Sequence, residues 1–154
     1  MAESVRDRDV RQAAKDALNA TGQFDAVYLS GLPEDYGQAA GQLRVAVIEM
    51  GNEFRVNDLW DSAQDGGLTV DGEAHITVLV RDQDPQVRDE LAELLINVIS
   101  NTLNGVAMDS WTTEQTSFVM RWRPIPSQAP ERRMMAVYEY QYFVEGWTSF
   151  NTTE

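Results

Sequence analysis

The residue types that most often carry catalysis are scarce in this chain. His75 is the only histidine, and no Gly-x-Ser-x-Gly segment offers a serine nucleophile to it. A solitary histidine is far more often a packed or surface side chain than a catalytic base. The chain contains no cysteine, so it forms neither a disulfide nor a thiolate metal site. We therefore predict that this protein is not an enzyme.

Carboxylates gather in residues 61–74, a segment that also contains two Asp-Gly pairs. An EF-hand calcium loop that began at Asp61 would need an acid or amide at its third position, where Ala63 stands. It would also need a glutamate at its twelfth position, where Gly72 stands. Asp-Gly pairs are typical of tight hairpin turns. The segment thus predicts a solvated acidic hairpin, and we expect no metal ion or other cofactor.

Two amphipathic helices are predicted from the spacing of apolar residues. Residues 4–20 form the first helix, which Gly22 ends. The second begins after Asp84 as N-cap, has Pro85 at its first position, and ends at Gly105. The expected apolar faces consist of Val10, Ala13, Ala14, Ala17 and Leu18 in the first helix, and of Val87, Leu91, Leu94, Leu95 and Val98, with Leu103 near the end, in the second.

Strands are predicted in the segments between and after the helices. Residues 26–29 form a short strand, and residues 43–50 form a strand with apolar side chains on both faces, which indicates a covered or central position. Residues 52–60 are expected to be the hairpin partner of that strand. Alternation of apolar residues predicts a further strand at 75–80.

Two late strands complete the predicted order. Residues 118–123 alternate, with Phe118, Met120 and Trp122 on an apolar face and Val119, Arg121 and Arg123 on the other. The following strand carries one continuous apolar face and reaches about thirteen residues, against a usual length of five to six. We expect a strand of that length to overhang its own domain and to pair with something else. Its apolar face consists of Met134, Ala136, Tyr138, Tyr140, Tyr142 and Val144.

The order of elements predicts an α+β fold, with an antiparallel or mixed β-sheet and two helices packed on one face. A length of 154 residues fits a single domain spanning 1–154. No run of eighteen apolar residues is present to span a bilayer, and residues 1–16 are too charged for a signal peptide. We expect a soluble protein that has no membrane partner.

The charge balance bears on the partners of this protein. The formal net charge is −13, from 25 acids and 12 bases, which argues against a free-standing nucleic-acid binder. All bases except Lys15 are arginines. Arginine favours fixed, bidentate partners, so some of these side chains are expected at subunit interfaces. A GC-rich coding sequence explains the same bias equally well.

Large aromatic residues continue to the end of the chain. Trp147 and Phe150 follow Gly146 in a short tail. Aromatic side chains are enriched at interface hot spots. Two alternatives remain open at this point: the tail 146–154 docks on a neighbouring subunit, or it docks on its own domain.

The pattern of the chain resembles tail terminator proteins of long-tailed bacteriophages. An N-terminal helix, strands and an acidic hairpin precede the segments ITVLVRDQDPQVRDELAELLINVISNTLNG, TSFVMRWRP and RRMMAVYEYQYFV. The resemblance covers residues 4–144 and is one of pattern, so it transfers no residue roles. It implies a hexameric ring that sits on the last ring of the tail tube, stops tube growth and joins the tail to the head.

The resemblance also implies the partners: other copies of the chain, the tail tube protein, and a head completion or connector protein. DNA would pass through an acidic lumen without specific binding, because like charges repel the phosphates. The protein would be assembled in the host cytoplasm and reside in the virion. Our candidate contact residues are Asp61, Asp65, Asp71 and Glu73 of the acidic segment and Tyr36 of the loop 30–41 for the tube or lumen, and Trp147 and Phe150 for a neighbouring subunit.

Two rival functions remain. Another head–tail connector or neck completion protein would have similar size and acidity. A small ligand-binding or hydrolytic α+β domain belongs to a different class and would need a deep apolar pocket with convergent polar groups.

Overall fold

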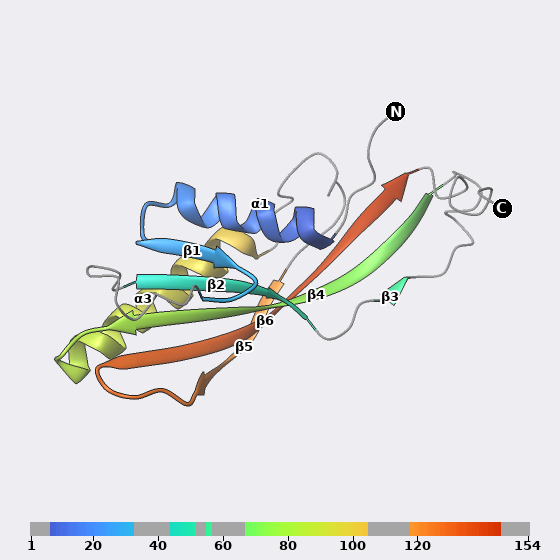
Figure 1. The fold of residues 1–154 in the computed structure, drawn as a ribbon. Helices are drawn as coiled ribbons and strands as arrows, with labels where there is room; N and C mark the ends of the chain where they lie inside the picture. The colour runs from blue at the N-terminus through green and yellow to red at the C-terminus, as the bar shows by residue number, and fades with distance from the viewer. Residues whose placement is uncertain (1–6, 33–43, 52–54, 57–66, 105–117, 146–154) are drawn as a thin grey trace.

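The computed structural model describes residues 7–32, 44–51, 55–56, 67–104 and 118–145 of the 154. Its helices and strands follow one another in the predicted order, which confirms the α+β fold class (Figure 1). In chain order the elements are α1 (Asp7–Ala20), β1 (Ala26–Leu29), β2 (Arg44–Met50), β3 (Arg55–Val56), β4 (Gly67–Arg81), α3 (Pro85–Leu103), β5 (Phe118–Ile125) and β6 (Glu131–Glu145).

All the strands belong to one mixed sheet. Its order is β1-β2-β4-β6-β5, and β3 pairs with β4 beside this path. The β1–β2 pair is parallel, whereas β2–β4, β4–β6 and β5–β6 are antiparallel. The longest pairing joins β4 to β6 over fifteen residues, from Gly67 opposite Glu145 to Arg81 opposite Glu131. Figure 1 shows these two strands as a long curved ribbon that continues beyond β2.

Both helices pack on the same face of the sheet, as predicted. One core cluster contains side chains from α1, from α3 and from alternate positions of β2, β4 and β6. The far face of the sheet, which we define by buried Val45, Val47 and Leu79, carries a second apolar cluster with Tyr28 and Leu32 packed against it. Strand β2 is therefore buried on both faces, which confirms the interpretation of its two-sided apolarity.

The helix ends follow from local chemistry. The carboxylate of Asp84 accepts a hydrogen bond of 2.9 Å from the backbone N–H of Gln86, and Pro85 begins α3, so the predicted start is confirmed. The helix stops at Leu103, where Asn104 is the C-cap. Gly22 takes a positive φ of 73° after α1, which also confirms its predicted role. The expected extension of α1 to residue 4 lies outside the described residues.

The buried stripe of α3 differs from the predicted one. Leu95 and Leu103 are buried as expected, but Val87 and Leu94 are exposed. The core instead receives a stripe at spacings of three and four residues, which is narrower than the predicted face. Its members are Ala92, Leu95, Ile99 and Leu103. Helix α3 thus contacts the sheet along this single stripe, and the apolar residues Val87 and Leu94 lie beside the stripe.

The second Asp-Gly pair does not form a turn, so the predicted hairpin at 61–74 is wrong at this point. Asp71 and Gly72 lie within β4, opposite Gln141 and Tyr140. A Cβ atom at Gly72 would overlap the ring of Tyr140. The glycine therefore serves the close approach of an aromatic side chain on the neighbouring strand, a role that glycine also has in strands.

Strand β3 has a different partner from the predicted one. Arg55 and Val56 pair with Asp71 and Val70 of β4, and not with β2. Strand β2 cannot accept them as a hairpin partner, because β1 lies along one of its edges and β4 along the other. The rest of the predicted 52–60 strand lies outside the described residues.

The two C-terminal strands confirm one pattern and correct another. The predicted core face of β6 is confirmed at Met134, Ala136, Tyr138 and Tyr140. The overhanging part of β6 pairs with β4 of the same chain. In β5 the alternation is broken, because the register shifts between Met120 and Arg123 and Arg121 takes a positive φ of 62°. As a result, Val119 and Trp122 both pack on the core, and the predicted placement of Val119 on the cationic face is wrong.

The Gly72 contact predicts a measurable cost. Gly72→Ala should lower the free energy of unfolding by about 1–3 kcal/mol, because the new methyl group overpacks the Tyr140 ring. Urea denaturation followed by circular dichroism measures the change. In a Tyr140→Leu background most of this cost should disappear. An equal cost in both backgrounds would contradict the proposed clash.

Candidate functional site

The sequence-predicted contact residues fall into two groups. Asp71 and Glu73 lie in β4, where their cross-strand neighbours on β6 are Gln141 and Glu139. The other predicted residues lie outside the described residues, namely Tyr36, Asp61, Asp65, Trp147 and Phe150. The described group therefore extends into the β4–β6 ribbon and does not sit on a hairpin tip.

His75 belongs to an acidic surrounding. Its Nε2 lies 3.5 Å from Oε1 of Glu73, two positions earlier on the same strand. Across the sheet it stands opposite Glu49 of β2 on one side and Val137 of β6 on the other. We interpret the imidazole of His75 as a contact partner of the neighbouring carboxylates.

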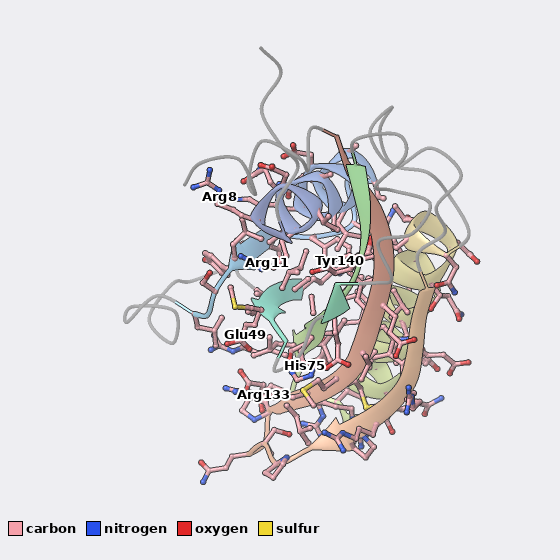
Figure 2. The ribbon with its side chains drawn as sticks, turned by 90° about the vertical axis from the view of Figure 1, so that its right-hand side faces the viewer. Arg8, Arg11, Glu49, His75, Arg133 and Tyr140 are labelled. Carbon is pink, nitrogen blue, oxygen red and sulfur yellow. The ribbon has the colours of Figure 1, made fainter. Side chains whose placement is uncertain are left out.

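An acidic patch forms on the far face of the sheet. Strand alternation places odd-numbered residues of β4 on that face, as buried Leu79 shows, and their partners on β6 lie beside them. Glu73 and Glu139 stand directly opposite each other, and exposed Glu49 lies one row further on, opposite His75. Figure 2 labels Glu49 and His75. We call Glu49, Glu73 and Glu139 the acidic patch.

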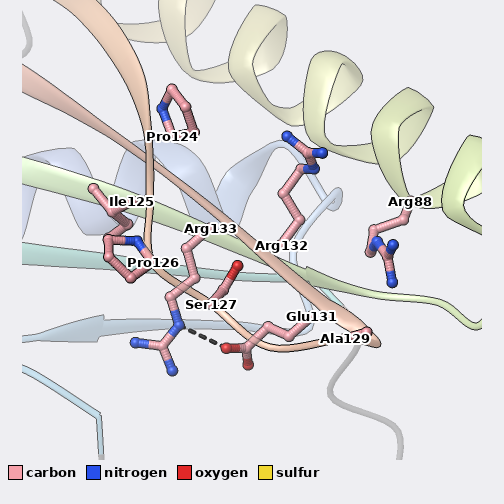
Figure 3. A pocket seen from close by; sticks show the side chains of 9 residues that line it. All are labelled: Arg88, Pro124, Ile125, Pro126, Ser127, Ala129, Glu131, Arg132 and Arg133. Atoms are coloured by element: carbon pink, nitrogen blue, oxygen red, sulfur yellow. Dashed lines mark hydrogen bonds and ion pairs between the residues drawn. The ribbon is translucent and has the colours of Figure 1, made fainter.

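At the other end of the ribbon, arginines surround a cleft of about 380 Å³. The cleft lies between the start of α3 and the turn that joins β5 to β6 (Figure 3). Arg88, Arg132 and Arg133 line it together with Ser127 and Glu131. An adjoining cleft of about 590 Å³ adds the side chain of Arg81. We call Arg81, Arg88, Arg132 and Arg133 the arginine end.

Carboxylates hold these arginines in place. Glu131, whose side chain is 13% exposed, lies 2.6 Å from Nε of Arg133 and 3.5 Å from Nε of Arg81. Arg132 pairs with Asp89 of α3 at 2.7 Å. Arg88 donates a 3.4 Å hydrogen bond from Nη1 to the backbone carbonyl of Asp82. The cations are therefore positioned by neighbours on β6, on α3 and in the link between β4 and α3.

Sequence reasoning did not find the arginine end. The signal that was present is the Arg132-Arg133 pair directly after a proline-rich loop. Nothing local links that pair to Arg81 or Arg88, which come from the end of β4 and the start of α3. The antiparallel register brings them together, because Arg81 stands opposite Glu131.

One arginine is buried in an unexpected place. Arg11 of α1 is only 6% exposed and lies next to the buried stripe of that helix. Its Nε and Nη1 atoms have no hydrogen-bond acceptor in the described part of the chain. Two buried guanidinium nitrogens without acceptors are costly, because their desolvation is not compensated.

The described residues offer neither a metal site nor a membrane-spanning helix. No group of three or more histidine, cysteine or acidic side chains in those residues could hold a metal ion. Within the same residues, no helix has the length and apolarity that a membrane crossing requires.

Comparison with known proteins gives a likeness of fold. No protein-family model and no curated protein matches this chain. Among solved structures, a chain of the virion of a native gene transfer agent particle has a similar fold, with a TM-score of 0.50. The two chains are 18% identical, and the match covers 89% of this chain and 92% of the other. The fold is therefore shared over nearly the whole of both chains.

The burial of Arg11 predicts that its charge destabilises the isolated protomer. Arg11→Met should raise the free energy of unfolding by about 1–3 kcal/mol, because methionine retains apolar contacts and removes the unsatisfied donors. Chemical denaturation measures the difference. Arg8→Met, at an exposed position on the same helix, is the matched control and should change the value by less than about 0.5 kcal/mol. A clear loss of stability in Arg11→Met would show that the guanidinium has an acceptor.

Proposed function

We propose that this chain is a structural protein of a phage-like virion and acts there as a tail terminator without catalytic activity. The observation that carries the proposal is the fold likeness to a virion chain over 89% of this chain and 92% of the other. The sequence pattern that resembles tail terminators supports the same role independently. In this role the protein forms a ring on the end of the tail tube, stops its growth and provides a surface for joining the tail to the head.

The shape of the sheet supports a ring-forming role. The β4–β6 ribbon continues beyond β2 and carries β3 on one edge (Figure 1). Along the outer edge of β6, β5 pairs only as far as Glu139, so the later positions of that edge have no strand partner among the described residues. Such an extension gives each copy a surface that reaches towards a neighbour. We propose a hexameric ring of identical copies.

The partners follow from that role. We propose that the ring contacts the tail tube protein on one side and a head completion or connector protein on the other. A net charge of −13 supports passage of DNA through the ring without specific binding. The loop 30–41, the segment 61–74 and the tail 146–154 remain our proposed contact segments.

The rivals differ in what supports them. A neck or connector protein at another level of the virion fits the same fold likeness. A ligand-binding domain would need an apolar pocket with convergent polar groups. The clefts described above have charged and proline side chains in their linings, which does not favour that rival.

The ring itself is open to direct measurement. Native mass spectrometry of the purified full chain over a concentration series should detect a hexamer, and negative-stain images should show a closed ring with a central hole. A chain that stays monomeric at all concentrations, both alone and with added tail tubes, would contradict the proposed ring.

Loss of the gene distinguishes a terminator from its nearest rival. In a terminator, disruption of the gene should yield tubes of abnormal length, because nothing stops their growth. Electron microscopy of the resulting particles measures the length distribution. Tubes of normal length together with heads that leak DNA would instead identify a connector that closes the head.

A further inference from the structure

Charges are separated along the β4–β6 ribbon. The arginines of the two strands stand at one end, at Arg81, Arg132 and Arg133. Acidic residues of the same strands stand towards the other end, and Glu131 is the exception that pairs with the arginines. Glu73 and Arg81 are eight residues apart on β4, which corresponds to about 27 Å at 3.4 Å per residue. The two ends of one copy are therefore held apart by a rigid ladder.

The acidic patch contains a repulsive pair. Glu73 and Glu139 are direct cross-strand neighbours, a position in which like charges destabilise a sheet. Their side chains are 29% and 46% exposed, so a partner can reach both. Within the copy, Glu73 meets His75 at 3.5 Å and Glu139 meets the exposed Arg121 at 3.4 Å. These long contacts leave room for a stronger cationic partner.

The arginine end has more donors than its local carboxylates use. Each guanidinium carries five N–H donors, and carboxylates favour bidentate contacts with them. Glu131 pairs with Arg81 and Arg133, and Asp89 pairs with Arg132. The nearby carboxylates of Asp82 and Asp84 instead accept hydrogen bonds from the backbone N–H groups of Asp84 and Gln86, at the start of α3. The side chains of Arg132 and Arg133 are 40% and 34% exposed, so an additional acidic partner can reach them from solvent.

We propose that the arginine end of one copy binds the acidic patch of the next copy. This inference rests on the proposed ring and names the surfaces that close it. Because the two surfaces lie at different places on one chain, their contact is head-to-tail, the type of contact that generates rings. A second copy fits better than DNA, since the net charge of −13 repels a phosphate backbone while the chain itself carries the matching carboxylates.

Charge reversal at each surface tests the contact. The first variant, Arg88→Glu with Arg132→Glu, makes the arginine end acidic and leaves the pairs of Glu131 intact. The second variant, Glu73→Arg with Glu139→Arg, makes the acidic patch basic and preserves a like-charge cross-strand pair. The control Arg8→Glu makes a comparable change at an exposed position that lies far from Arg133 in Figure 2.

Sedimentation velocity of the full-length chains over a concentration series measures assembly, and circular dichroism verifies folding. Each double variant alone should assemble at least about tenfold more weakly than the unmodified chain, because a like-charge contact replaces an attractive one. An equimolar mixture of the two double variants should recover assembly, since one chain then has two acidic surfaces and the other two basic ones. The Arg8→Glu control should assemble like the unmodified chain.

The outcomes separate this inference from the proposed function. If both double variants assemble as strongly as the unmodified chain, the proposed contact is overturned and the terminator role still stands. Weak variants that do not recover on mixing also overturn it, because complementarity then fails. Should one variant not fold, Arg88→Gln with Arg132→Gln replaces charge reversal by neutralisation, and unchanged assembly in that variant overturns the contact. An unmodified chain that forms no oligomer, even on tail tubes, overturns the ring and this contact together.

Discussion

The antiparallel ladder between β4 and β6 is the constraint on which the rest of this structure depends. Fifteen consecutive residue pairs join these strands. The other described strands pair with β4 or β6, either directly or, for β1, through β2. Both helices pack on the sheet face to which β4 and β6 contribute. The register of such a ladder is strongly specified, because a slip by one residue would exchange buried and exposed faces. At Gly72 the ladder gains a further restriction, since Tyr140 lies where another side chain would stand.

The same register decides where the charges lie. Burial of the even-numbered positions of β4 and β6 leaves Glu73 opposite Glu139 on the far face and Arg81 opposite Glu131 at the other end. The strand register thus sets both the packing of the core and the positions of the charges, because both follow from strand alternation. In a chain with a large net negative charge, one cleft is consequently lined by three arginines and a single carboxylate.

The charged surfaces are the structural basis of the proposed assembly role. The single histidine meets a carboxylate, and the clefts are lined by arginines that neighbouring carboxylates already hold. Surfaces of this kind supply specificity for a partner more than they supply chemistry. The fold likeness to a virion chain extends over nearly the whole length of both chains, and the proposed ring gives each of these surfaces a neighbour.

Features that local chemistry controls could be predicted from the amino-acid sequence alone. Asp84 and Pro85 set the start of α3, Gly22 ended α1, and the alternation in β6 predicted its core face. The order of these elements was sufficient for the α+β class. Only the tertiary structure decided that the Asp71-Gly72 pair lies inside a strand, that β3 pairs with β4, and that a bulge at Arg121 brings Val119 to the core. Each of these outcomes depends on which strand lies opposite, and that neighbour comes from a distant part of the chain. The arginine end arose in the same way, because the residues that form it meet only when the two long strands pair.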